Sequence, residues 1–409
     1  MSPPPWLGEA PGRLDVLGGV ADYSGSLVLQ SPIAATTRVT IVPTPEPRLR
    51  VVSDQEGVVD PPPPTDDEID FSSDSAAPLV DWLDARDVPR WARYPLGCLF
   101  LFQRAWGWRP DGGLSIHIST DVPTSMGVSS SAALEVATLR ALEAASGRRF
   151  AGTALARLAQ RAENEVVGAP CGLMDQLAAA HGARGALLPI LCRPDAMRDP
   201  AALPEGVIVA GWPSAVKHAV TGVEYGAART AAFMGKRILE VALGRWFQHL
   251  AELSPSVVGG VPADVLPASM TGSEFVARYG AVEDPHSTVA SDRRYPVRAA
   301  AEFAVGENFR CELAERLFRG EVADRIRTPR LAGELMYQSH LGYGSIGLGR
   351  PETDAMVAAV RDLGPARGFH GARSSGGGCG GTVVVLLEAQ ALPELRRLAE
   401  RAGSPPLIL

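Results

Sequence analysis

A serine-rich segment is the first part of the chain whose residue types and spacing could do chemistry. It reads VPTSMGVSSSA over residues 122–132 and leads into a pattern typical of a helix. Gly127 lets the backbone turn close to a ligand, and Ser129, Ser130 and Ser131 fall in the first helical turn, where amide N–H groups lack partners. That end of a helix favours an anion, and the hydroxyls add donors to a phosphate and an oxygen ligand for Mg²⁺. The segment therefore indicates a phosphate-binding loop, with a plain serine N-cap as the alternative.

Two other chemistries for these serines are disfavoured by the neighbouring residues. No Gly-Lys-Ser/Thr follows the glycine, so the segment is not a Walker A loop. No G-x-S-x-G surrounds a serine, and none of the seven histidines is marked as a partner, which argues against a serine hydrolase.

Charged residues in three further segments could act on a phosphate. The segments are PGRLDVLGGVADYSG at 11–25, AENEVVGAPCGLMDQ at 162–176 and SGGGCGGT at 375–382. A carboxylate such as Asp175 can orient an acceptor hydroxyl and take its proton, and Arg13 offers a fixed positive charge for it. From the residues alone, Asp175 could instead cap a helix, Arg13 could form a structural ion pair, and Glu163 could lie on a solvated helix face.

Taken together, the four segments resemble the GHMP kinases, specifically the galactokinase branch. Their order and spacing match, and they span residues 11–382. Within the branch the resemblance is greatest to the arabinokinases. It is carried by DYSGSLVLQ at 22–30, GAPCG at 168–172, ENFR at 307–310 and GELMYQSH at 333–340.

The resemblance implies an ATP-dependent sugar kinase that phosphorylates an anomeric hydroxyl, with Mg²⁺ as cofactor. It implies that Asp175 is the catalytic base, that Arg13 is its active-site arginine, and that Ser131 and Glu163 bind Mg²⁺. It also implies that the nucleotide is bound by Gly127, Ser129, Ser130, Ser131 and Trp91. Trp91 matches an aromatic position near adenine, although aromatic residues spaced three apart on a helix more often belong to a core.

The same resemblance assigns the sugar to Asp22, Gly19, Gly172 and Tyr225. Galactokinases carry a Glu-His pair where this chain has Gly19 and Val20, and that glutamate is associated with the exocyclic hydroxymethyl group of the sugar. Losing such a partner leaves a buried hydroxyl unpaired, at about 1–3 kcal/mol, which disfavours galactose. Either the sugar has no C5 substituent, as in L-arabinose, or it has a larger one for which Gly19 makes room. Residues 212–218, WPSAVKH, depart from the arabinokinase pattern. A higher-carbon sugar or a uronic acid therefore remains an alternative substrate.

The elements that must position these residues mix strands and helices without a βαβ rhythm, which predicts an α+β fold. Strands are expected at 36–42, 49–53, 114–119 and 382–387. Helices are expected at 130–145, 152–167, 226–244, 297–318, 329–340 and 392–402. Prolines suggest a boundary that separates an N-terminal domain, 1–195, from a C-terminal domain, 196–409. The resemblance implies a two-domain GHMP kinase fold with the active site in the cleft between the domains.

Composition limits the partners of the chain. Its 409 residues exceed a usual single core, and a net charge of −7 argues against non-specific nucleic-acid binding. No apolar stretch approaches membrane-helix length, and the N-terminus does not read as a secretion signal. Five scattered cysteines without a CxxC fit a reducing cytoplasm.

Two other functions are compatible with parts of the pattern. One is a non-catalytic sugar or nucleotide sensor on the same fold, against which the intact set of Arg13, Ser131, Glu163 and Asp175 argues. The other is a GHMP kinase for mevalonate or homoserine, against which DYSG at 22–25 argues. The sequence does not define an oligomeric state.

Overall fold

The structure is a computed structural model that describes residues 5–65, 68–69, 74–169, 171–182, 185–193, 195–214, 222–320, 324 and 327–409. Strands and helices are mixed along the chain, which confirms the predicted α+β class. The contacts divide the chain into two compact units. Unit 1 comprises Met1–Arg13, Ile33–Pro123 and Ser129–Gly182, and unit 2 comprises Leu14–Pro32, Thr124–Val128 and Ala183–Leu409.

This division differs from the predicted boundary after residue 195. Residues 14–32, 124–128 and 183–195 belong to unit 2 by their contacts. Two long strands account for residues 14–32, because β1 (Trp6–Leu17) and β2 (Leu27–Thr44) each contribute residues to both units. A single cut in the sequence cannot reproduce such a division.

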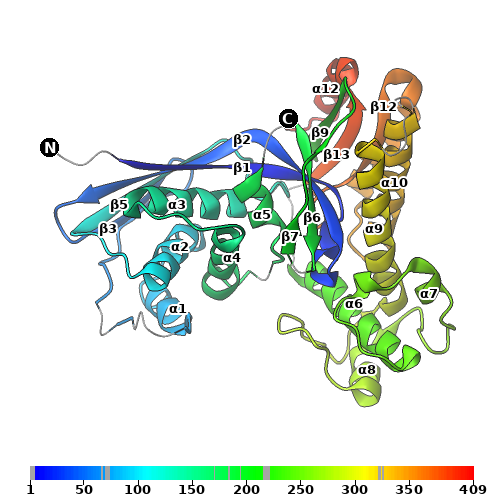
Figure 1. Cartoon of the computed structure of the whole chain (residues 1–409), viewed down its shortest axis with the longest axis horizontal. Helices are drawn as coiled ribbons and strands as arrows, with labels where there is room; N and C mark the ends of the chain where they lie inside the picture. The colour runs from blue at the N-terminus through cyan, green and yellow to red at the C-terminus, as the bar shows by residue number, and fades with distance from the viewer. Residues whose placement is uncertain are drawn as a thin grey trace. The chain divides into compact units, whose positions relative to one another are not determined.

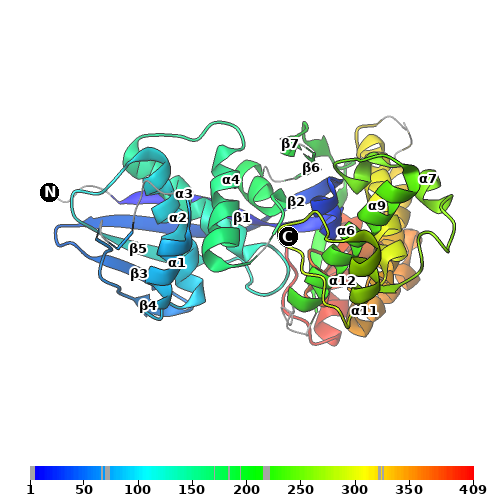
Figure 2. The ribbon, with the colours of Figure 1, turned by 90° about the horizontal axis from the view of Figure 1, so that it is seen from below.

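Unit 1 is a sheet with helices on one face, as Figure 1 and Figure 2 show. Its strands follow the order β4-β3-β5-β2, with β1 beside β2. The elements not yet bounded are β3 (Leu49–Ser53), β4 (Gly57–Val59), β5 (Gly113–Thr120), α1 (Ala77–Asp84), α2 (Arg90–Trp106), α3 (Ser130–Ser146), α4 (Ala154–Arg161), a π-helical turn η2 (Ala162–Val167) and α5 (Met174–His181). Alternate apolar residues such as Val39, Ile41 and Ile116 point into a core that also holds Leu96 and Leu139.

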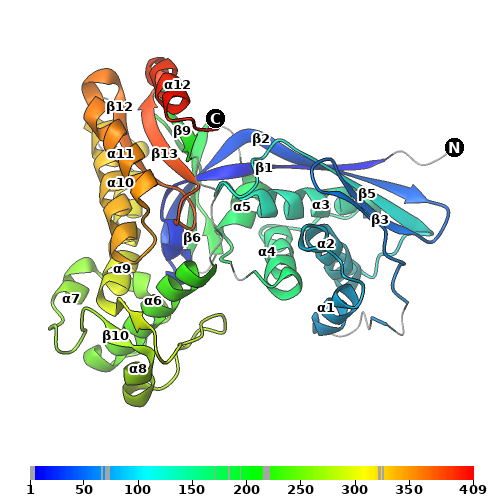
Figure 3. The ribbon, with the colours of Figure 1, turned by 180° about the vertical axis from the view of Figure 1, so that it is seen from behind.

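Unit 2 combines small sheets with long helices. Its strands are β6 (Ala186–Cys192), β7 (Asp195–Met197), β8 (Ala201–Ala202), β9 (Val207–Pro213), β10 (Met270–Thr271), β11 (Arg294–Tyr295), β12 (Phe369–Ser374) and β13 (Thr382–Glu388). Its helices are α6 (Gly222–Leu243), α7 (Pro255–Gly259), α8 (Gly272–Tyr279), α9 (Val297–Phe318), α10 (Arg327–Ser345), α11 (Pro351–Leu363) and α12 (Leu392–Arg401). Helices α10 and α11 pack on the antiparallel sheet β12-β13-β9, as Figure 3 shows. Short 3₁₀ turns are η1 (Gly19–Ser24), η3 (Leu250–Glu252), η4 (Pro365–Arg367) and η5 (Ala389–Ala391).

The predicted helices and strands are confirmed, with differences at their ends. Helix 297–318 and strand 49–53 have the predicted bounds, whereas the strand predicted at 36–42 is the second half of the longer β2. The helix predicted at 152–167 changes from α to π geometry at Ala162. All five cysteines are free thiols. Among the described residues, we find no helix whose length and apolar character would let it cross a membrane.

Candidate functional site

Arg13 and Asp175 meet within unit 1 although 162 residues separate them. The guanidinium donates from Nε to Oδ1 and from Nη2 to Oδ2 of Asp175, each at 2.9 Å. The Arg13 side chain is 4% exposed and that of Asp175 is 24% exposed. Asp175 lies in the first turn of α5, whose N-cap residue is Leu173, so Asp175 is not a capping residue. A buried cation therefore holds a carboxylate that a ligand can still reach.

Glu163 lies in the π turn η2 and is only 8% exposed. The solvated-face alternative is therefore wrong; the exposed pair on this segment is Arg161 with Glu165. Burial raises the pKa of Glu163 to about 6, a hydrogen bond from Ser131 opposes the rise, and the charge of Asp175 adds to it. Ser131 and Glu163, which were predicted to bind Mg²⁺ together, are thus in direct contact.

Two residues beside Glu163, Gln176 and Glu135, were given no role from the sequence. Gln176 donates from Nε2 to Oε2 of Glu163 at 2.7 Å and to Oε2 of Glu135 at 3.1 Å. Glu135 is fully buried, and burial together with the charge of Glu163 raises its pKa well above the ordinary value. One signal was present in the sequence, because Glu135 lies four residues after Ser131 and is therefore on the same face of the helix.

The serine segment enters helix α3 through left-handed backbone. Gly127 has a φ of +70° and Ser129 a φ of +58°. The Ser129 side chain makes no capping hydrogen bond, and its buried Oγ has no partner, which contradicts the plain N-cap. Ser130 and Ser131, in the first turn of the helix, are partly exposed. The Ser129 hydroxyl without a partner and the first-turn amide N–H groups, which have no acceptor within the helix, suit an anion at this helix start.

Trp91 and Tyr94 lie on α2 in unit 1. Trp91 is partly buried and packs against the core of the unit, as the core alternative expected. Tyr94 lies near the acidic pair, since burial and the charges of Glu163 and Glu135 raise its pKa to about 12. Gly172, assigned to the sugar, lies in the partly exposed loop before α5.

In unit 2 the glycine-rich segment 375–381 packs against residues 126 and 127. Thr382 donates from Oγ1 to the carbonyl oxygen of Met126 at 2.7 Å. A Cβ at Gly381 would lie 3.1 Å from that oxygen, and a Cβ at Gly127 would lie 3.5 Å from the carbonyl oxygen of Ser375. Glycine is needed at Gly381 because of this close approach and a φ of +80°.

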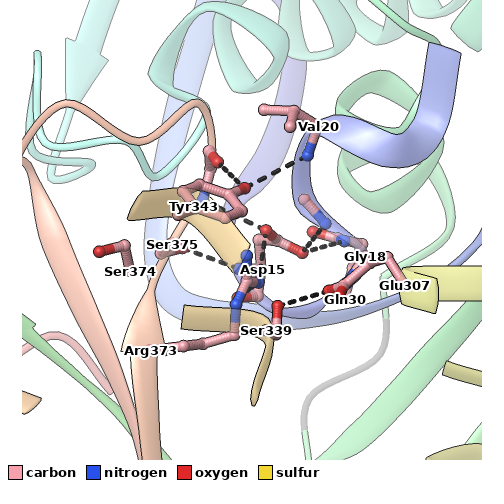
Figure 4. Close-up of polar contacts among 12 residues, drawn as sticks. Asp15, Gly18, Val20, Gln30, Glu307, Ser339, Tyr343, Arg373, Ser374 and Ser375 are labelled. Carbon is pink, nitrogen blue, oxygen red and sulfur yellow. Dashed lines mark hydrogen bonds and ion pairs between the residues drawn. The ribbon is translucent and has the colours of Figure 1, made fainter. Parts of the chain in front are cut away.

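A buried network joins η1 to the glycine-rich segment, and Figure 4 shows it in close-up. Asp15 and Arg373 form an ion pair at 2.8 Å with both side chains fully buried. The Asp15 carboxylate also accepts N–H groups from the Gln30 side chain and from the backbone of Gly19 and Gly376. Four donors on one carboxylate offset the cost of burying its charge.

Tyr343 closes the same network. Its hydroxyl donates to the carbonyl oxygen of Gly376 at 2.6 Å and accepts from the Val20 N–H at 3.2 Å. The Arg373 guanidinium lies 4.8 Å from the centre of the Tyr343 ring. A Cβ at Gly19 would lie 2.0 Å from the Tyr343 hydroxyl and 2.8 Å from Arg373 Nη2. The space beside Gly19 is therefore filled, contrary to the interpretation that Gly19 makes room for a larger group.

Asp22 and Tyr225 share one neighbourhood in unit 2. Asp22 is 6% exposed and accepts the Tyr23 N–H at 2.7 Å, and the rings of Tyr23 and Tyr225 meet edge to face at 6.1 Å. Beside them, Arg229 forms a double hydrogen bond with Asp284. Burial lowers the pKa of Arg229, but Asp284, Tyr225 and Asp22 together raise it above its ordinary value. Of the WPSAVKH stretch, residues 215–218 lie outside the described residues.

Comparison with known proteins identifies the family. The model of the GHMP kinase N-terminal domain matches residues 93–183, and that of the C-terminal domain matches residues 321–403. A galactokinase from Chloroflexus aggregans is 32% identical over 396 residues, which cover 96% of this chain and 86% of that protein. The chain belongs to the GHMP kinase family.

Other GHMP kinases extend the comparison. An L-arabinokinase from Arabidopsis thaliana is 31% identical over 473 aligned positions, covering 98% of this chain and 45% of that protein, so the chain spans less than half of its length. A galactokinase from Lactococcus lactis, solved with galactose, has a TM-score of 0.76 at 20% identity, covering 98% of this chain and 92% of that one. A mevalonate kinase from Methanococcus jannaschii has a TM-score of 0.61 at 16% identity, covering 98% and 96%. These two structures show the shared fold.

Proposed function

We propose that this GHMP kinase is an ATP-dependent sugar 1-kinase of the galactokinase branch, acting on an L-arabinose-like sugar. The relatives named galactokinase and L-arabinokinase, at 32% and 31% identity, support this reaction class. The observation that carries the proposal is the double hydrogen bond between Arg13 and Asp175, on the same unit as Ser131 and Glu163.

In the proposed reaction Asp175 is the catalytic base. The anomeric oxygen attacks the γ-phosphorus of ATP, the bond from that phosphorus to the ADP oxygen breaks, and the hydroxyl proton passes to a carboxylate oxygen of Asp175. Arg13 keeps the carboxylate oriented, and its fixed charge stabilises negative charge on the reacting oxygens. The partial exposure of Asp175, beside a nearly buried Arg13, fits these two roles.

The nucleotide phosphates are assigned to the serine segment and the metal to its neighbours. Ser129, Ser130 and Gly127 supply hydroxyl and amide donors, and the unpartnered Oγ of Ser129 favours a ligand there. Glu163 and Ser131 offer hard oxygen atoms, which fit Mg²⁺ because that ion is usually held by one or two carboxylates plus phosphate oxygens. When bound, Mg²⁺ neutralises charge on the phosphates. Trp91 stays a candidate for contact with adenine.

The sugar is assigned to Asp22, Tyr225 and Gly172, and Gly19 decides between the two sugar classes. The resemblance places Gly19 where galactokinases have a glutamate that contacts the C5 substituent. In this chain Tyr343 and Arg373 fill the space beside Gly19, so the polar contact is lost without any room being gained. This observation favours a sugar without a C5 substituent, such as L-arabinose, over a C5-extended sugar.

A coupled ATP-turnover assay over a sugar panel tests the proposal. The panel comprises L-arabinose, D-galactose, D-galacturonic acid and a C5-extended heptose, each with ATP and Mg²⁺. We expect the highest kcat/KM for L-arabinose and turnover of D-galactose reduced by about 10- to 100-fold, which corresponds to one unpaired hydroxyl. Saturable sugar binding without turnover of any sugar would indicate the sensor instead. A preference for the heptose would contradict the assignment at Gly19.

A further inference from the structure

Gln176 holds two buried carboxylates with one amide group. Its side chain is fully buried on α5, directly after Asp175. Its Nε2 donates to Glu163 Oε2 at 2.7 Å and to Glu135 Oε2 at 3.1 Å. Its Oε1 and Oε1 of Glu135 are buried without hydrogen-bond partners. The Glu163 contact sets the orientation of the amide, because the flipped amide would aim its oxygen at Oε2 of that carboxylate.

This contact involves one particular oxygen of Glu163. Oε2 accepts from Gln176, and the Cys171 thiol lies 3.4 Å from the same oxygen. The Glu163 carboxylate therefore cannot rotate without losing the 2.7 Å hydrogen bond from Gln176. Neither of these two contacts involves Oε1, and the Ser131 hydroxyl lies against the same carboxylate, so Oε1 and the Ser131 hydroxyl are the oxygen atoms that we assign to the metal ion.

We propose that Gln176 is a positioning residue that fixes the Glu163 carboxylate for Mg²⁺. The inference rests on the proposed function, since it assigns Glu163 to the metal. Polar groups that hold a metal ligand tune its affinity, and their loss typically weakens metal binding by about 10- to 100-fold. Because Asp175 and Gln176 are consecutive, the first turn of α5 then sets both the catalytic base and the metal ligand.

Metal binding without turnover separates this role from a purely structural one. Mn²⁺ replaces Mg²⁺, and the electron paramagnetic resonance signal of free Mn²⁺ is followed while it is titrated into the enzyme with saturating ADP. Gln176→Met keeps the side-chain length and removes both N–H donors. Gln176→Asn keeps an amide that is one methylene too short to reach both carboxylates. For each variant that unfolds cooperatively on heating, we expect the Kd for Mn²⁺ to rise by about 10- to 100-fold.

Gln160→Met is the matched control. Gln160 lies on α4 in the same unit and donates from Nε2 to the carbonyl oxygen of Cys171 at 3.2 Å, not to a carboxylate. The proposal predicts a Kd within about twofold of wild type for this variant, well below the change expected at Gln176. An unchanged Kd in a folded Gln176 variant would overturn the proposal. So would failure of both variants to fold, because Gln176 would then be needed only for the structure.

The same Mn²⁺ titration of the wild type and of Glu163→Gln distinguishes failure of this proposal from failure of the proposed function. If wild type binds Mn²⁺ with ADP and Glu163→Gln does not, the metal assignment holds and the Gln176 variants decide the inference. If wild type and Glu163→Gln bind Mn²⁺ equally, the assignment of Glu163 is wrong, and the inference falls with it.

Discussion

At the scale of single residues, Arg13 fixes the orientation of the Asp175 carboxylate without covering the whole of it. Arg13 donates one N–H to each oxygen of the Asp175 carboxylate, and 24% of the Asp175 side chain remains exposed. The local pattern of the sequence left helix capping open for Asp175, and only the resemblance favoured catalysis. The contact with Arg13 could not be predicted from spacing, because it joins positions 162 residues apart.

Asp175→Asn tests the role of the base. The amide can still accept from Arg13 through its oxygen, but it cannot take the proton of the acceptor hydroxyl. We expect kcat to fall by about 10²- to 10⁴-fold, the usual contribution of general base catalysis, while the Kd for ADP stays near that of wild type. Single-turnover kinetics and calorimetric titration measure the two quantities. A near-normal kcat would reject the assignment.

The buried Glu163 predicts a pH-dependent stability. Its pKa rises from the ordinary 4.5 to about 6 on folding, so its contribution to stability is full below pH 4.5 and is lost as the pH rises through 6. The loss amounts to about 2 kcal/mol. In metal-free protein, Glu163→Gln should raise the free energy of unfolding by about 1–2 kcal/mol at pH 8 and leave it nearly unchanged at pH 4.5. Urea unfolding at both pH values measures this, and equal stability at pH 8 would contradict it.

At the scale of elements, η1 and the glycine-rich segment are held by one buried network. Asp15 and Tyr343 each bind both segments, and Arg373 pairs with Asp15, although the sequence marked none of the three. The sequence identified Gly19 as a departure from the galactokinase pattern. It could not show that the space beside Gly19 is filled, because Tyr343 comes more than 300 residues later in the chain.

Gly19→Ala tests this packing, with Gly152→Ala as the control. Both glycines have left-handed backbone, with φ values of +48° and +54°, but a Cβ at Gly152 meets nothing within 4 Å. Gly152→Ala should lower the free energy of unfolding by about 1 kcal/mol, because only the backbone is strained. Gly19→Ala should lower it by about 2–4 kcal/mol, because its Cβ also meets Tyr343. Urea unfolding gives both values.

Tyr343→Phe completes the test as a double-mutant cycle. Removing the hydroxyl should reduce the extra cost of Gly19→Ala by at least about 0.5 kcal/mol, since residues in contact do not act additively. Additive costs, or equal costs for Gly19→Ala and Gly152→Ala, would show that the two residues do not compete for the same space.

At the scale of the whole molecule, the residues proposed for catalysis and metal binding lie in one unit, and most of those proposed for the sugar lie in the other. Arg13, Asp175, Glu163 and Ser131 belong to unit 1, and Asp22, Gly19 and Tyr225 belong to unit 2. The α+β class and the long helices were predictable because hydrophobic periodicity is local information. The division into units was not, because residues 14–32 join unit 2 through contacts made more than a hundred residues away.

The most direct test of the account is ³¹P nuclear magnetic resonance of the product formed from ATP, Mg²⁺ and L-arabinose. A kinase that uses Asp175 to activate the anomeric hydroxyl produces a sugar monophosphate whose phosphorus couples to the anomeric proton, together with one equivalent of ADP. The account predicts this signal for the wild-type protein. Phosphate on any other carbon, or no sugar phosphate from any pentose or hexose supplied, would contradict it.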